Sequence, residues 1–211
     1  GELRSYQGEA LGWLSFLAIG WAGLLVPSFL RQIESDLHQT DAGIGAYYLV
    51  GALGYGLGSL GGGFLTERFG RRTILVGGAL LNAIGLVGQG ALPSWLPFVL
   101  FGIARSVGSG ILDGGANGLI LDLYPEARGR ALNVAHLFFA LGALGAPFAV
   151  AGLTSAGIGW EETMRWSGLL SLPLALLLAV SDLADRRPNA AGTPATAGAG
   201  GRTPPETGPS A

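Results

Sequence analysis

Long apolar stretches alternate with short polar segments along most of the chain. Charged residues are absent from residues 42–66 and again from residues 73–104. A helix of about 20 apolar residues is long enough to cross a lipid bilayer. The pattern therefore predicts an all-α membrane protein with six transmembrane helices, at residues 10–30, 42–66, 73–91, 96–121, 131–153 and 164–181.

The two ends of the chain differ from this apolar centre. Residues 1–9 lack the basic start of a secretory signal, and we assign them to a short cytoplasmic segment. Residues 182–211 are rich in alanine, glycine, proline and threonine, and such a composition buries too little apolar surface to fold. We therefore expect a six-span domain at residues 10–181, followed by a disordered low-complexity tail.

Composition supports a membrane protein. Charged residues make up 12% of the chain, against about 25% in an average soluble domain. The absence of cysteine excludes disulfides and thiolate metal sites, and no basic run suggests nucleic-acid binding. We expect no cofactor and no metal, and the lipid bilayer as a partner.

Arginine positions predict the orientation in the membrane. The chain has 12 arginines and no lysine, and with six spans nine of them fall on one side and two on the other, while Arg105 lies within a span. Basic residues concentrate on the cytoplasmic side of membrane proteins. We therefore expect both termini in the cytoplasm and a location in the bacterial cytoplasmic (inner) membrane.

A charged loop separates the second span from the third. It holds Gly63, Glu67, Arg68, Gly70, Arg71 and Arg72. A positive-inside turn between two helices explains the arginines on its own. The order of these residues and their place after the second span resemble the signature loop of the major facilitator superfamily of secondary transporters, with Glu67 where aspartate is commoner.

Polar residues inside the spans are the candidates for solute binding. Arg105, Ser109, Asp113 and Asn117 follow one another at steps of four, which places them on one slowly drifting helix face. A charged residue at membrane depth is costly unless it faces a cavity or a partner. Asp113 is the main candidate for a proton- or solute-binding group. A structural ion pair is the alternative, above all for Arg105.

Further polar residues lie on neighbouring spans. Asn133 and His136 are about one turn apart, and His136 is able to titrate near neutral pH, although hydration at the membrane interface explains it equally well. Asn82 and Gln89 share a helix face that is able to line the same cavity, although hydrogen bonds between helices are the simpler explanation for both. Asn82 and Asn133 are therefore lesser candidates for solute binding. Gly54, Gly58 and Gly62 repeat at steps of four, which predicts close packing of the second span against another helix.

Three later segments are similar to one branch of that superfamily, the sugar permeases near the fucose–proton symporters. They are residues 112–120, residues 122–139 and residues 139–147, the last of which ends in Gly-Ala-Pro. The resemblance implies that Asp113 and Asn117 face a central cavity. It also implies a cytoplasmic gating cluster of Glu67, Arg68 and Arg71 with Asp122 nearby. The first span lacks the acidic residue expected of fucose permease itself.

The same resemblance implies twelve spans in two halves around a midplane site, whereas this chain has six. We therefore expect the N-terminal half of a transporter for a small, sugar-like polar solute that is coupled to protons, with either a C-terminal half or a second copy of the chain as its partner. Drug or metabolite efflux by the same fold and an inactive truncated fragment remain alternatives. An intramembrane serine protease built on Ser109 and His136 is disfavoured, because Val107 stands where its motif requires glycine.

Overall fold

A computed structural model describes residues 2–181 and 183 of the chain. The predicted tail at residues 182–211 therefore lies outside the described part, apart from Leu183. Within the described part every regular element is an α-helix: α1 Glu2–Ser28, α2 Leu30–Asp36, α3 Asp41–Phe69, α4 Arg71–Ala91, α5 Trp95–Leu123, α6 Arg128–Ser155 and α7 Trp160–Val180.

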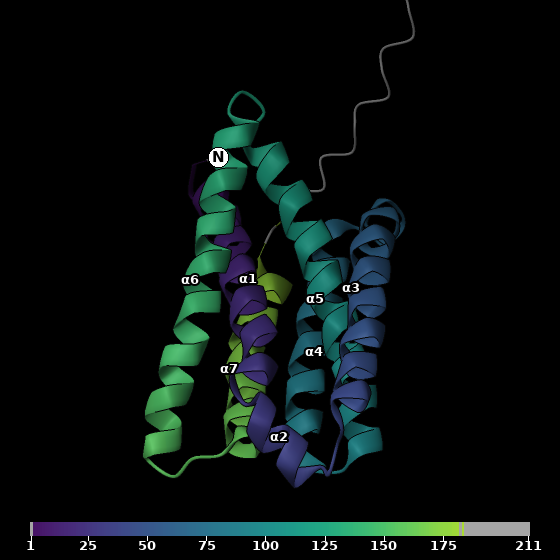
Figure 1. Cartoon of the computed structure of the whole chain (residues 1–211). Helices are drawn as coiled ribbons and strands as arrows, with labels where there is room; N and C mark the ends of the chain where they lie inside the picture. The colour runs from purple at the N-terminus through teal and green to yellow at the C-terminus, as the bar shows by residue number, and fades with distance from the viewer. Residues whose placement is uncertain (1, 182, 184–211) are drawn as a thin grey trace, which may run out of the picture.

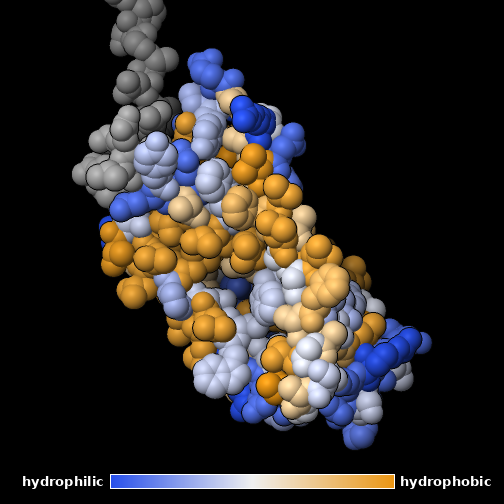
Figure 2. All heavy atoms as spheres, turned by 90° about the vertical axis from the view of Figure 1, so that its left-hand side faces the viewer, coloured by the Kyte–Doolittle hydropathy of each residue, from blue (hydrophilic) through white to orange (hydrophobic). Residues whose placement is uncertain are grey.

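Six of these helices are long and apolar enough to cross a membrane: α1 from Tyr6 onward, and all of α3, α4, α5, α6 and α7. The six predicted spans are thereby confirmed. Each helix begins one to eight residues before the predicted apolar run, because the polar residues that precede the run are helical as well, whereas α1 and α7 end one or two residues earlier than predicted. The face in Figure 2 has an apolar band across its middle and hydrophilic residues at both ends, as expected of a protein that spans a bilayer.

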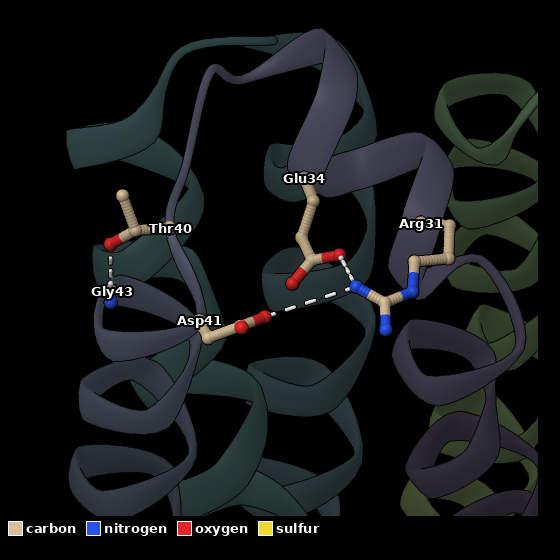
Figure 3. Close-up of polar contacts among 5 residues, drawn as sticks. All are labelled: Arg31, Glu34, Thr40, Asp41 and Gly43. Atoms are coloured by element: carbon tan, nitrogen blue, oxygen red, sulfur yellow. Dashed lines mark hydrogen bonds and ion pairs between the residues drawn. The ribbon is translucent and has the colours of Figure 1, made fainter.

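The segment after the first span contains a helix that the polar pattern did not predict. Residues 31–41 lie between the first two predicted spans and are mostly polar, which is typical of a loop, whereas α2 occupies most of that segment. Ile33 is completely buried and fixes α2 to the bundle, and Arg31 Nη1 pairs with Glu34 Oε2 at 2.7 Å one helical turn away (Figure 3). Thr40 then caps the start of α3 by accepting a hydrogen bond from the Gly43 N–H (Figure 3).

The long helices form a bundle in which α6 and α3 lie at opposite sides (Figure 1). Between them, α5 packs against α3, α4 and α1, while α1 packs against α6 and α4 packs against α7. The two chain reversals at α3–α4 and α5–α6 lie at one end of the bundle, and α2 and the α6–α7 loop lie at the other (Figure 1).

Glycines allow a close approach between α3 and α5 and between α1 and α6. Gly54, Gly58 and Gly62 are all buried and face α5, which confirms the predicted packing ridge. A Cβ on Gly58 would lie 2.3 Å from the Val107 carbonyl oxygen, and one on Gly142 would lie 2.1 Å from the Leu17 carbonyl oxygen. The α3–α5 and α1–α6 pairs therefore meet backbone to backbone, which fixes the height at which their polar side chains meet.

Candidate solute-binding site

Asp113 lies at the centre of a polar cluster that three helices form. From α5 itself, Asn117 Nδ2 donates a hydrogen bond to Asp113 Oδ1 at 3.1 Å. From α3, the Tyr55 hydroxyl donates a second hydrogen bond to the same carboxylate. From α6, His136 lies close enough to interact electrostatically with it. The cluster therefore offers a carboxylate, an amide, a phenol and an imidazole within the membrane-spanning region.

The cluster lies on an open face of the described chain. Asp113, Asn117 and Tyr55 are partly exposed, and His136 is exposed. His136 Nδ1 lies 2.8 Å from the Leu132 carbonyl oxygen, and its ring lies 5.7 Å from that of Phe16 on α1. Asn133 is also exposed, about one turn before His136 on α6. Polar groups at this depth need an aqueous cavity or a covering partner.

The polar stripe on α5 turns from this face into the interior of the bundle. Arg105 is 8% exposed and Ser109 is 4% exposed, whereas Asp113 and Asn117 remain partly open. Each step of four residues rotates the side chain by about 40°, so eight residues separate the directions of Arg105 and Asp113 by about 80°. The structure therefore brings Asp113 and Asn117 together and places Arg105 apart from them.

Arg105 belongs to a second, buried polar network. Its Nη1 donates to the Ala22 carbonyl oxygen at 3.0 Å and its Nη2 donates to the Tyr47 hydroxyl at 3.3 Å. Gln89 Nε2 donates to the same hydroxyl at 2.9 Å and to the Phe98 carbonyl oxygen at 3.3 Å. Asn82 is 1% exposed and accepts a hydrogen bond from Ser109. Asn82 and Gln89 thus make hydrogen bonds between helices.

The charged loop lies at the end of the bundle that holds the α3–α4 reversal. Gly70 joins α3 to α4 with a φ of 84°, a positive value that residues other than glycine rarely adopt. Arg71 Nη2 pairs with Asp122 Oδ2 at 2.5 Å and so ties α4 to the end of α5. The other predicted loop residues do not join this pair: Glu67, Arg68 and Arg72 are exposed, and Gly63 faces open space.

Two tyrosines near these sites were not identified from the sequence. Tyr55 contacts Asp113, and Tyr47, eight residues earlier, contacts Arg105. Both lie beside the glycine ridge of α3, and this position was the sequence feature from which their contact with α5 could have been predicted.

A further tyrosine, Tyr124, follows α5. Burial and a hydrogen bond to the Glu9 carboxylate raise the pKa of Tyr124 to about 12. Its contact with Glu9 ties the start of α1 to the end of α5.

Comparison with known proteins adds a family assignment. Residues 11–207 match the model of the Major Facilitator Superfamily. The uncharacterised transporter YfkL of Bacillus subtilis is 24% identical over 79% of this chain, and the match covers 40% of YfkL. A zebrafish (Danio rerio) protein named sodium-dependent glucose transporter 1 is 33% identical over 68% of this chain and 25% of its own length. The 4-hydroxybenzoate transporter PcaK of Pseudomonas putida is 30% identical over 75% of this chain and 34% of its own length. The chain thus spans well under half of each of these relatives.

Proposed function

Because the chain belongs to the major facilitator superfamily, we propose that residues 2–181 act as the N-terminal half of a secondary transporter for a small polar solute. The observation that carries this proposal is the cluster around Asp113. A carboxylate, an amide and a phenol held on three helices give hydrogen-bond partners for hydroxyl groups at membrane depth. Transport by this arrangement makes and breaks no covalent bond.

A sugar-like solute suits the composition of the cluster. The Asp113 carboxylate already accepts hydrogen bonds from Tyr55 and Asn117, so it is poorly placed to act as the lone counter-ion of an organic cation. Amides, carboxylates and aromatic rings together suit a polyhydroxylated ligand, and the glucose transporters among the relatives agree with that choice. We propose Asp113 as the residue that couples uptake to protons, with His136 beside it as a second titratable group.

The second half of the transporter completes the cavity. Asp113 and His136 are open in the described chain, and a carboxylate that faces lipid at the helix centre costs about 2.5–3.5 kcal/mol on insertion scales. Another six-helix half, or a second copy of this chain, covers these groups and moves against them during transport. In the same proposal, Glu67, Arg68 and Arg72 contact that partner on the cytoplasmic side, and both termini are cytoplasmic in an inner membrane.

Substitution of Asp113 tests this function. Asp113→Asn keeps the size of the side chain but removes its charge and its ability to bind a proton, so we expect normal insertion into the membrane and loss of proton-coupled uptake. The measurement is uptake of labelled sugars at several external pH values, in cells that express the natural gene with its flanking sequence. Asp41→Asn is the control, since it makes the same chemical change at an exposed carboxylate outside the cluster. Uptake by the Asp113→Asn protein with an unchanged pH profile would show that Asp113 has a structural role.

A further inference from the structure

Arg105 is a buried cation without a counter-ion in the described chain. It lies ten residues into α5, about 15 Å from the start of that helix. Among residues 2–181 and 183, no carboxylate lies within ion-pair distance of its guanidinium. Its two hydrogen-bond acceptors, the Ala22 carbonyl and the Tyr47 hydroxyl, are both neutral. A guanidinium is always charged, so this site carries an uncompensated positive charge at membrane depth.

The same network contains two buried polar atoms that have no hydrogen-bond partner in the described chain. Arg105 Nε is buried and has no acceptor, and Gln89 Oε1 is buried and has no donor. Both residues converge on the Tyr47 hydroxyl, which accepts from each of them. Aromatic rings enclose this point, because Phe98 and Trp95 lie 5.2 Å and 6.3 Å from the ring of Tyr47. A structural clamp alone does not require a charge here, because the NH2 group of a neutral amide also has two donors, one for a carbonyl and one for a hydroxyl.

Arg105 contacts α1 next to a turn that lacks one backbone hydrogen bond. Pro27 has no N–H, so the carbonyl of Gly23 lacks its helical donor next to the carbonyl that Arg105 holds. A Cβ built on Gly23 would meet no atom within 4 Å, so there is open space beside this turn. Guanidinium groups bind carboxylates more strongly than neutral carbonyls. A carboxylate that reached Arg105 would therefore compete with the Ala22 carbonyl for its guanidinium.

We propose that Arg105 binds the carboxylate of a small organic acid and exchanges its bond to the Ala22 carbonyl for that ligand. This deepens the proposed function, on which it rests, by adding a carboxylate to the polar solute whose hydroxyl groups suit the cluster around Asp113. The hydroxyl or ring portion of the solute then extends along α5 toward Asp113. Binding releases α1 from α5 at the level of Ala22, so solute recognition is linked to movement of this part of α1.

Matched charged and neutral probes test the proposal on the full chain in lipid nanodiscs. The pairs are D-glucuronate with D-glucose, and benzoate with benzamide, measured by isothermal titration calorimetry. We expect at least one acid to bind about 10-fold or more tightly than its neutral partner, the usual range for a hydrogen bond to a charged group. Arg105→Gln should remove this preference and Arg105→Lys should retain part of it.

The control is Arg31→Gln, which removes an exposed arginine and should leave the preference intact. Circular dichroism and size-exclusion profiles establish that each variant is folded. The proposal is overturned if neither acid exceeds its neutral partner, if no probe binds, or if Arg31→Gln removes the preference as well. Equal binding of glucose and glucuronate that Asp113→Asn abolishes would refute the carboxylate site while leaving the transport function intact.

Discussion

At the scale of single residues, Tyr55 decides how the Asp113 carboxylate is presented. The backbone of Tyr55 packs directly against α5, because a Cβ on Gly110 would lie 2.1 Å from the Tyr55 carbonyl oxygen. The hydroxyl therefore reaches Asp113 from a helix that has little freedom to shift. Tyr55 and Asp113 together join α3 to α5 at the same depth as His136 on α6.

Removal of the Tyr55 hydroxyl should weaken transport without unfolding the protein. A hydrogen bond to a charged group contributes about 1.5–3 kcal/mol, so we expect Tyr55→Phe to lower kcat/KM for uptake by about 10- to 100-fold. The measurement is initial uptake rate against solute concentration in the same cells as the Asp113 test. Tyr6→Phe, at an exposed position, is the matched control. Uptake that stays within about two-fold of the original protein would mean that Tyr55 only fills space.

At the scale of helices, most of the fold was predictable because the membrane imposes one requirement on every span. The apolar runs and the arginines between them predicted six spans. The glycine repeat at 54, 58 and 62 predicted close packing against another helix, and the structure identifies that helix as α5. Helix α2 was missed because its residues are mostly polar, and a single buried Ile33 fixes it.

The candidate site was predictable only in part. The four-residue spacing identified the polar residues of α5 from Arg105 to Asn117. Spacing alone does not show which of these side chains lie on the open face and which lie in the interior of the bundle. The burial of each side chain depends on how closely α3 and α4 approach α5, and glycines on all three helices determine that distance. For the same reason the sequence did not pair Tyr47 with Arg105 or Tyr55 with Asp113.

The α3–α5 seam makes a prediction about stability. Gly58→Ala places a methyl group 2.3 Å from a backbone oxygen, so the two helices must separate, and we expect a loss of about 1–3 kcal/mol in unfolding free energy. Gly56→Ala is the control, since its Cβ would meet no atom within 4 Å. Unfolding in mixed micelles with increasing denaturing detergent measures both variants. Equal stability of the two variants would contradict the close packing of this seam.

At the scale of the whole molecule, the arginine asymmetry predicts which end of the bundle faces the cytoplasm. Ala127 and Ala156 are exposed just outside the two ends of α6. In intact cells, an impermeant maleimide should label cysteine at position 156 and should not label cysteine at position 127 until the membrane is permeabilised. Labelling at 127 alone would reverse the proposed orientation and would place the charged loop outside the cell.

The central proposal is that these six helices are one half of a transporter. Large apolar side chains are exposed along α3 and α6, including Leu53 and Leu57 on α3 and Leu144 and Phe148 on α6. Lipid accommodates such residues, but it does not accommodate the open polar cluster of Asp113 and His136. The proposal of a second half therefore rests on the polar cluster rather than on the apolar stripes.

Uptake by the monomeric chain is the most direct test of this account. The purified chain is separated by size-exclusion chromatography with light scattering, and the monomer fraction is reconstituted into proteoliposomes with an imposed proton gradient. Labelled glucose, glucuronate and benzoate serve as the solutes. The account predicts no uptake above that of protein-free liposomes, because alternating access requires a second half to move against the first. Uptake of any of these solutes by a stable monomer would contradict it.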